Sequence, residues 1–151
     1  MAEIVRRRAA VILAIDVRAP HGVIFVQRAT HLRSHAGQIG FPGGAVEDVD
    51  DGDLQRTALR ELYEEVGVAP GDVEILGELP ALHVNVSAFD VSPFVGVVRL
   101  GSLRVDGTET SDAFTIPLAD VLARLTDGVV EVGSIEVASP VLDYGERRIW
   151  G

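Results

Sequence analysis

Residues 60–68, Arg-Glu-Leu-Tyr-Glu-Glu-Val-Gly-Val, decide the fold, because the remainder of the chain is organised to position them. A helix turns about 100° per residue, so a helix over residues 53–66 gathers apolar side chains on one arc and sets Glu61 and Glu65 at its border. Carboxylates four residues apart on a helix repel each other, and apolar neighbours remove part of their hydration. The pattern therefore favours a bound cation beside this helix.

A divalent metal ion is the simplest cation for this position. Glu64 lies about 60° from Glu61 around the helix axis. Glu61, Glu64 and Glu65 therefore form a candidate cluster of hard oxygen ligands suited to Mg²⁺ or Mn²⁺. The alternative is an ordinary amphipathic helix on which Arg60 pairs with Glu64 at i, i+4. For the glutamates alone, both interpretations stay open.

A glycine-rich loop ahead of the helix favours the metal site. Gly37, Gly40, Gly43 and Gly44, with Pro42 among them, exclude a regular element. Their spacing predicts a loop whose backbone comes close to a ligand such as phosphate or metal. A tight turn without a ligand is the alternative.

The helix boundaries have local signals. Asp50, Asp51 and Asp53 are candidate N-caps and complement the helix dipole. Gly67 suits the left-handed residue that follows a helix end. We therefore expect the helix to end at Val66.

The order of residue types in 60–68 resembles the second half of the Nudix box, the signature of hydrolases that cleave a nucleoside diphosphate linked to another group. The first half departs from the family pattern, in which five residues separate the glycine from an acid and seven more precede the arginine. Here five residues lead from Gly44 to Asp50, but nine separate Asp50 from Arg60. We interpret this as a two-residue expansion in which Asp50 replaces the usual glutamate, which puts the role of that acid in metal binding in question.

A second motif resembles the coenzyme A pyrophosphatase branch of the Nudix hydrolases. Residues 24–29, Ile-Phe-Val-Gln-Arg-Ala, followed by Arg33, Gly37 and the loop Phe41-Pro42-Gly43-Gly44, keep the spacing of the extra motif that marks this branch. The leading positions depart from the Leu-Leu-Thr of the branch, whereas the arginines and glycines match. Residues 32–38 and 149–151 add to the likeness.

The resemblance implies an activity and a set of site residues. The expected reaction is hydrolysis of the pyrophosphate bond of coenzyme A or its thioesters to 3′,5′-ADP and 4′-phosphopantetheine, with Mg²⁺ or Mn²⁺ as the cofactor. Arg60 is expected to orient the glutamates, and Glu64 or Glu109 to accept a proton from the attacking water. The implied metal ligands are Glu61, Glu65, Glu64 and Gly44; the implied substrate contacts are Arg28, Arg33, His35 and Gly43; the implied catalytic residues are Glu64, Glu109 and Arg60.

Several of these residues have a plainer interpretation. Arg28 and Arg33 offer forked donors for phosphate, but salt bridges that hold the loop against the acidic surface are the alternative. His35 lacks the paired spacing of a zinc site and is otherwise a solvated loop residue. Glu109 is otherwise a solvated loop acid.

Composition limits the classes of protein. A chain of 151 residues with 47% hydrophobic content is expected to form one domain over 1–151, with the Nudix box at about 44–68. The net charge of −10 argues against nucleic acid as a partner and leaves a small-molecule substrate. The absence of cysteine excludes disulfides and thiolate chemistry. The apolar run 9–15 is too short to cross a membrane and lacks the features of a signal peptide, so we expect a cytoplasmic protein with no membrane partner.

The periodicity predicts an α+β fold. Apolar and β-branched runs predict a central strand at 8–17, its antiparallel return at 23–28, and later strands at 73–79, 82–86, 89–100, 129–137 and 139–142. A second helix is predicted at 117–125, with its apolar stripe in the core: Leu118, Val121, Leu122 and Leu125. The resemblance implies the Nudix-like α/β/α sandwich with a mixed β-sheet.

Three other functions stay open. The first is a Nudix hydrolase of another nucleoside diphosphate derivative, such as ADP-ribose or a dinucleoside polyphosphate. The second is a non-catalytic module that binds a nucleotide metabolite. The third is a scaffold with an acidic helix. Members of the coenzyme A branch continue after a similar Ile-Trp-Gly into a C-terminal helix, whereas this sequence stops at Gly151. Either the domain closes without that helix or the sequence is shortened. Without that helix, we expect exposed apolar surface and association between copies, although the oligomeric state is otherwise open.

Overall fold

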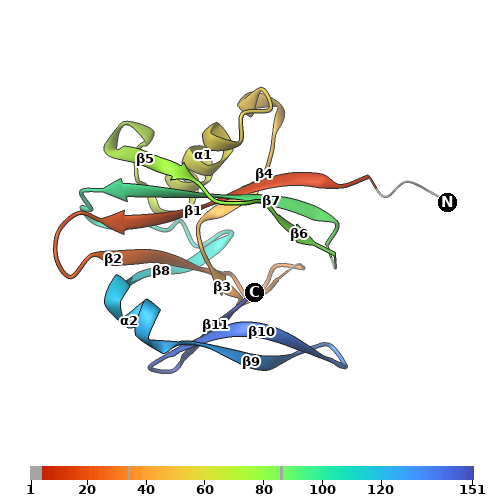
Figure 1. Ribbon diagram of the computed structural model, residues 1–151. Helices are drawn as coiled ribbons and strands as arrows, with labels where there is room; N and C mark the ends of the chain where they lie inside the picture. The colour runs from red at the N-terminus through yellow and green to blue at the C-terminus, as the bar shows by residue number, and fades with distance from the viewer. Residues whose placement is uncertain (1–4, 34, 86) are drawn as a thin grey trace.

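The computed structural model describes residues 5–33, 35–85 and 87–151, and it forms a mixed β-sheet with helices on both sides (Figure 1). The larger sheet has the strand order β3-β2-β1-β7-β5, with β4 on β1, β6 on β7 and β8 on β2. A smaller sheet has the order β11-β10-β9. The strands of the larger sheet are β1 Arg7–Asp16, β2 Gly22–Arg28, β3 Ile39–Gly40, β4 Gly43–Ala45, β5 Val73–Glu78, β6 Leu82–Val84, β7 Phe89–Val98 and β8 Thr110–Pro117. The other elements are α1 Leu54–Val66, α2 Leu118–Arg124, β9 Leu125–Val132, β10 Ile135–Tyr144, β11 Arg147–Trp150, and the short 3₁₀ helices η1 Asp48–Asp50 and η2 Pro70–Asp72.

Strand β1 is the centre of the larger sheet. It pairs in parallel with β7 along its whole length, and antiparallel with β4 and with the start of β2. Its run of aliphatic residues explains the central position, because a strand that is covered on both faces has continuous rather than alternating apolar residues. The strands predicted at 8–17, 23–28, 73–79 and 89–100 are confirmed within two residues at each end.

Helix α1 packs on one face of the sheet and is the helix predicted from the sequence. The Asp53 side chain caps it by accepting hydrogen bonds from the backbone N–H groups of Gln55 and Arg56. Gly67 follows the helix with φ 79°, in the left-handed region that glycine adopts without strain. Ala58, Leu62 and Val66 are fully buried against β1, β2 and β7.

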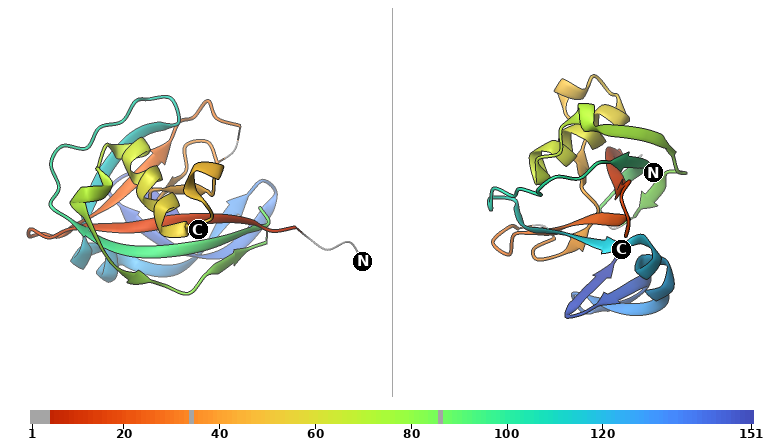
Figure 2. Two further views of the ribbon diagram at one scale, coloured as in Figure 1. Left: turned by 90° about the horizontal axis from the view of Figure 1, so that it is seen from above. Right: turned by 90° about the vertical axis from the view of Figure 1, so that its left-hand side faces the viewer.

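The opposite face carries a second core. Side chains of β2 and β8 pack there against the smaller sheet, where Leu142 and Ile149 are buried, and Leu118 and Val121 of α2 pack at its margin. Figure 1 and the right-hand view of Figure 2 show α1 and the α2–β11 segment on opposite sides of the central strands. The predicted α+β sandwich with a mixed sheet is confirmed.

The second helix and the C-terminal strands differ from their prediction. Leu122 is 70% exposed and Leu125 is 52% exposed, so the expectation that the whole apolar stripe is core is wrong. The physical reason is that α2 has only seven residues and Leu125 already begins β9, which turns the later stripe positions outward. The single strand predicted at 129–137 is a hairpin instead, because Gly133 adopts φ 65° and the chain reverses there.

Two predicted segments extend beyond what the structure describes. Ser34, within the segment 32–38, and Val86, within the strand predicted at 82–86, lie outside the described residues. In the described part of the chain, none of the helices combines the length and apolar character needed to cross a membrane.

Candidate active site

Two glycines of β4 hold the glutamates of α1. The register Ala10↔Gly44 and Val11↔Gly43 anchors β4 to β1, and the Gly43 N–H donates a hydrogen bond of 3.1 Å to Oε2 of Glu65. A Cβ atom on Gly44 would lie 2.5 Å from Oε1 of Glu61, closer than real Cβ contacts allow. Gly44 therefore leaves the space in which the Glu61 carboxylate lies.

Arg60 and Asp50 form a buried clamp behind these glutamates. Asp50 is only 1% exposed, and both its carboxylate oxygens accept hydrogen bonds of 2.9 Å from the Arg60 guanidinium. The Thr57 hydroxyl and the Glu47 N–H also donate to Asp50. The guanidinium of Arg60 lowers the pKa of Asp50 well below its usual range, although burial alone would raise it. Asp50, the acid whose role in metal binding the sequence left in question, therefore binds arginine through both oxygens.

The other side of Arg60 faces the acids predicted to bind metal. Its Nη1 group donates to Oε1 of Glu61 at 2.9 Å and to Oε2 of Glu64 at 3.3 Å. The i, i+4 pair of Arg60 and Glu64 thus exists, as the plainer interpretation expected, but the same guanidinium also binds Glu61. Arg60 connects the buried Asp50 to the carboxylates of the site.

The pKa values of both inner glutamates are raised. Burial raises the pKa of Glu61 to about 7, against the lowering effect of Arg60. Burial, together with the charge of Glu61, raises the pKa of Glu65 to about 8, while the hydrogen bond from Gly43 and the charge of Arg28 lower it. A cation that binds both carboxylates would stabilise their ionised forms, which burial and their mutual repulsion otherwise disfavour.

The donor set fits a divalent ion in its chemistry. Carboxylate oxygens are the ligands that Mg²⁺ and Mn²⁺ prefer, and Glu61, Glu64 and Glu65 supply them from one helix. Among residues 5–33, 35–85 and 87–151, however, no three His, Cys, Asp or Glu side chains are grouped so as to hold a metal ion. Glu61 is bonded to Arg60 and Glu65 to the Gly43 N–H, which draws the two carboxylates to different partners. Metal binding by Glu61, Glu64, Glu65 and Gly44 stays a prediction.

A cavity of about 290 Å³ opens beside the glutamates. Glu64 and Glu65 line it from α1, and Glu109 lines it from the segment before β8. The backbone carbonyl of Glu109 accepts a hydrogen bond of 2.8 Å from the Ala29 N–H, which ties this segment to the end of β2. The structure therefore brings together the two residues predicted as candidate bases.

The same cavity contains residues that sequence reasoning missed. Asp106 and Thr108 line it together with Thr110. The Asp106 carboxylate accepts hydrogen bonds from both the backbone N–H and the hydroxyl of Thr108, and these bonds lower the pKa of Asp106. The Asp-Gly-Thr turn signal was present in the sequence, but nothing local indicated that this turn lies opposite α1.

The predicted substrate residues do not all meet at this cavity. Arg28 ends β2 near enough to Glu65 for its charge to lower the pKa of that group. Gly43 lies in β4, bonded to Glu65. Arg33 and His35 are exposed in the loop after β2, and the His35 ring bonds to the Gln38 side chain at 2.8 Å. Arg28 and Gly43 thus lie beside the glutamates, whereas Arg33 and His35 lie on the outer loop.

Comparison with known proteins gives relatives of one family. A family model described as the NUDIX domain matches residues 5–131. Proteins named uncharacterized Nudix hydrolase NudL, from Salmonella paratyphi B and Salmonella newport, are 44% identical to this chain over 118 residues, which is 78% of this chain and 60% of each relative. The chain therefore spans about 60% of the length of these curated relatives.

Solved structures share the fold. A NUDIX hydrolase from Alicyclobacillus acidocaldarius matches with a TM-score of 0.60 and 25% identity, covering 82% of this chain and 84% of that one. The NUDIX domain of Shewanella oneidensis NrtR, solved in complex with ADP ribose, matches with a TM-score of 0.62 and 24% identity, covering 79% of this chain and 77% of that one. At this identity the likeness to NrtR concerns the fold alone.

Proposed function

This chain belongs to the Nudix family, and from that premise we propose that it hydrolyses the pyrophosphate bond of coenzyme A or its thioesters in a reaction that needs Mg²⁺ or Mn²⁺. The products are 3′,5′-ADP and 4′-phosphopantetheine. The observation that carries the proposal is the buried pair Glu61 and Glu65, with raised pKa values, held against Gly43 and Gly44 beside a cavity. Nudix hydrolases generally use divalent metal ions, which supports metal binding at this pair.

The choice of coenzyme A rests on the motif between β2 and β4. Arg28 ends β2 beside Glu65, and its charge suits the pyrophosphate that must approach the carboxylates. Arg33 and Gly37 follow at the spacing of the coenzyme A branch, in the loop that leads to Gly43 and Gly44. The motif therefore begins at Arg28 beside Glu65, continues through the outer loop, and ends at Gly43 and Gly44, which contact Glu65 and Glu61.

The chain's own residues orient the reacting groups. Asp50 holds Arg60 from the buried side, and Arg60 in turn fixes Glu61 and Glu64 by hydrogen bonds. The Gly43 N–H fixes Glu65. Glu61 and Glu65, with help from Glu64 and the Gly44 carbonyl, would hold a Mg²⁺ or Mn²⁺ ion, which would supply positive charge that lowers the pKa of water and offsets charge on the phosphate.

The proton of the attacking water goes to Glu64 or Glu109. Both line the cavity of about 290 Å³ with Glu65, so both are placed to act on a water there. Glu64 is already bonded to Arg60. Glu109→Gln tests the base without touching the proposed metal ligands. If Glu109 is the base, kcat falls while KM for coenzyme A stays nearly unchanged; an unchanged kcat leaves Glu64 as the base.

A substrate panel tests the proposal. The purified protein is incubated with coenzyme A, ADP-ribose and diadenosine polyphosphates, each with Mg²⁺ and with Mn²⁺, and the products are resolved by chromatography. The proposal predicts release of 3′,5′-ADP from coenzyme A that stops in the presence of chelator. Cleavage of ADP-ribose or a dinucleoside polyphosphate alone would refute the substrate and leave a Nudix hydrolase of another nucleoside diphosphate derivative.

One observation favours a second candidate, a non-catalytic module that binds a nucleotide metabolite. In the described part of the chain, the acids are not grouped as a ready metal site, and Arg60 occupies oxygens of both Glu61 and Glu64. Such a module would bind coenzyme A in the presence of chelator and cleave none of the panel. Calorimetric titration with and without Mg²⁺, beside the product assay, distinguishes the two candidates.

A further inference from the structure

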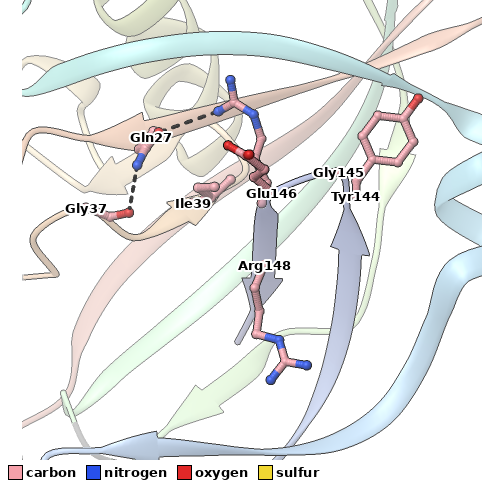
Figure 3. Close-up of a pocket in the computed structure, with 8 residues that line it drawn as sticks. Gln27, Gly37, Ile39, Tyr144, Gly145, Glu146 and Arg148 are labelled. Atoms are coloured by element: carbon pink, nitrogen blue, oxygen red, sulfur yellow. Dashed lines mark hydrogen bonds between the residues drawn. The ribbon is translucent and has the colours of Figure 1, made fainter.

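A second cavity, of about 610 Å³, lies outside the carboxylate site (Figure 3). Gln27 of β2, Gly37 and Ile39 form one wall. The turn between β10 and β11 forms the other wall, with Tyr144 and Glu146 among its lining residues. Nothing in the proposed reaction at Glu61 and Glu65 uses this cavity.

The cavity is connected to the carboxylate site through two consecutive residues of β2. Successive side chains of a strand point to opposite faces, so Gln27 and Arg28 face different sides of the sheet. Gln27 lines the second cavity, whereas the charge of Arg28 acts on Glu65. The loop between β2 and β3 passes around this strand end, where the Gly37 N–H donates to the Arg28 carbonyl and the Gly37 carbonyl accepts from the Gln27 amide. The two places therefore adjoin consecutive residues at one strand end, and Gly37 is bonded to both of these residues.

Arg147 gives the cavity a fixed wall. Its guanidinium lies 3.7 Å from the centre of the Phe114 ring, bonds to Asp112 at 2.7 Å, and reaches the Gln27 side-chain oxygen at 3.5 Å. Phe114 stacks on Phe25, which stacks on Phe41 of the glycine-rich loop. The wall is thus braced by packing that extends to the loop holding Glu65.

The charges around this cavity are balanced. Arg147 is paired with Asp112, and Arg148 is paired with Asp143 at 2.8 Å. Glu146 adds a further negative charge to the lining. Arg147 and Arg148 line the cavity with Glu146, whereas Asp112 and Asp143 are not among its lining residues. A phosphate monoester would have to compete with Asp112 and Asp143 for these arginines and would meet Glu146, which disfavours an anionic group. The Gln27 amide, the Gly37 carbonyl and the apolar surface of Ile39 and Tyr144 suit a neutral chain of amides with an aliphatic part.

We infer that this cavity binds the pantetheine arm of the substrate, an inference that rests on the proposed coenzyme A hydrolysis. The pantetheine arm is uncharged, carries two amides, a hydroxyl and a geminal dimethyl group, and is long and flexible. The adenosine half carries the 3′-phosphate, which the balanced lining disfavours. Gln27 and the β10–β11 turn are therefore determinants of specificity, while Glu61 and Glu65 serve the reaction itself.

Two variants and a matched control test the inference. Gln27→Ala removes the amide, and Glu146→Trp places a bulky ring at an exposed turn of the cavity wall. Glu136→Trp makes the same change at an exposed position of β10 that does not line the cavity. We expect KM for coenzyme A to rise about five- to tenfold in Gln27→Ala and Glu146→Trp, with kcat nearly unchanged, and to stay unchanged in Glu136→Trp.

Product inhibition identifies which half of the substrate the cavity holds. In Gln27→Ala and Glu146→Trp, inhibition by 4′-phosphopantetheine should weaken by the same factor as KM rises, while inhibition by 3′,5′-ADP should not change. An unchanged KM in both variants, or a weaker inhibition by 3′,5′-ADP, overturns the inference while leaving coenzyme A hydrolysis intact. Absence of 3′,5′-ADP from the wild-type reaction refutes the proposed function itself, and the inference with it.

Discussion

Arg60 connects the buried Asp50 to two glutamates of the site. Its guanidinium donates hydrogen bonds to both carboxylate oxygens of Asp50 on its inner side and to Glu61 and Glu64 on its outer side. The sequence predicted that Arg60 orients the glutamates, and the contacts with Glu61 and Glu64 are of the kind that role needs. The sequence did not indicate that Asp50 holds Arg60, because the two-residue expansion concealed the pairing.

Asp50→Asn tests this clamp. The variant removes a negative charge that compensates the Arg60 guanidinium, whose side chain is only 14% exposed, so we expect the free energy of unfolding to fall by about 3 kcal/mol. Urea denaturation followed by circular dichroism measures it. Asp51→Asn is the matched control, because Asp51 is exposed and its pair with Arg56 lies in solvent. Equal stability of the two variants would contradict the clamp.

The raised pKa values of Glu61 and Glu65 predict how stability depends on pH without metal. Each group binds its proton more tightly in the folded state than at the ordinary value of 4.5, so the folded state holds more protons between pH 4.5 and about 8. In that window the free energy of unfolding falls as pH rises, by up to about 1.4 kcal/mol per pH unit for each titrating group. Asp50, with a lowered pKa, acts in the opposite direction, and only in acid below this window.

Thermal unfolding in chelator between pH 5 and pH 9 measures this dependence. We expect a lower Tm at pH 8 than at pH 6 for the wild type, and a smaller difference for Glu65→Gln, which has no proton to lose. Saturating Mg²⁺ should reduce the difference as well, because the cation stabilises the ionised carboxylates. A Tm that is level across this range in chelator would show that the glutamates are not desolvated.

At the scale of elements, β4 and α1 form the site as a unit. Gly44 lies so close to the Glu61 carboxylate that a methyl group has no space there. Gly44→Ala should therefore displace Glu61 and lower kcat by a factor on the order of 100, with the fold retained. Gly71→Ala, in η2 where a Cβ would meet nothing, is the control for a glycine substitution as such. A fully active Gly44→Ala would remove Glu61 from the proposed mechanism.

The second helix offers a test of the corrected core. Leu122 is 70% exposed, so Leu122→Gln should change the free energy of unfolding by no more than about 0.5 kcal/mol. Ile116 of β8 is fully buried, and Ile116→Ala should cost about 2–5 kcal/mol. Urea denaturation of both variants compares them. A large loss of unfolding free energy in Leu122→Gln would contradict the exposed position of Leu122.

Exposed apolar side chains on the hairpin of β9 and β10 support the predicted association between copies of the chain. Leu125, Val129 and Ile135 are each more than half exposed on β9 and β10. Surfaces of this kind favour contact with another apolar surface. We expect concentration-dependent association in size-exclusion chromatography, reduced in Ile135→Thr. A monomer at every concentration would contradict this prediction.

At the scale of the whole molecule, local signals were predictable and long-range contacts were not. The cap at Asp53, the glycine after Val66 and the aliphatic run of β1 are encoded within a few residues, and each was confirmed. The pairing of Asp112 with Arg147, and the place of Asp106 opposite α1, depend on segments far apart in the sequence. The cavity between β2 and the β10–β11 turn arises from the same long-range packing, so no sequence pattern indicated it.

The site was predicted in part for the same reason. The acids of α1 were recognisable because their spacing is local. The prediction that the glycines exclude a regular element was wrong, because Gly40 ends β3 and Gly43 and Gly44 begin β4 by pairing with β1, a long-range contact. The positions of Arg33 and His35 depend on the path of a long loop, which local patterns do not determine. The single domain over 1–151 and the roles of the site residues remain predictions.

The most direct test is the rate at which 3′,5′-ADP is released from coenzyme A by the wild type, Glu65→Gln and the matched variant Glu74→Gln, whose side chain is exposed on β5. With saturating Mg²⁺ or Mn²⁺, we predict wild-type rates for Glu74→Gln. For Glu65→Gln we predict a loss on the order of 100-fold or more, with the fold intact by circular dichroism. A Glu65→Gln protein that releases 3′,5′-ADP at the wild-type rate would contradict the assignment of the reaction to the Glu61 and Glu65 site.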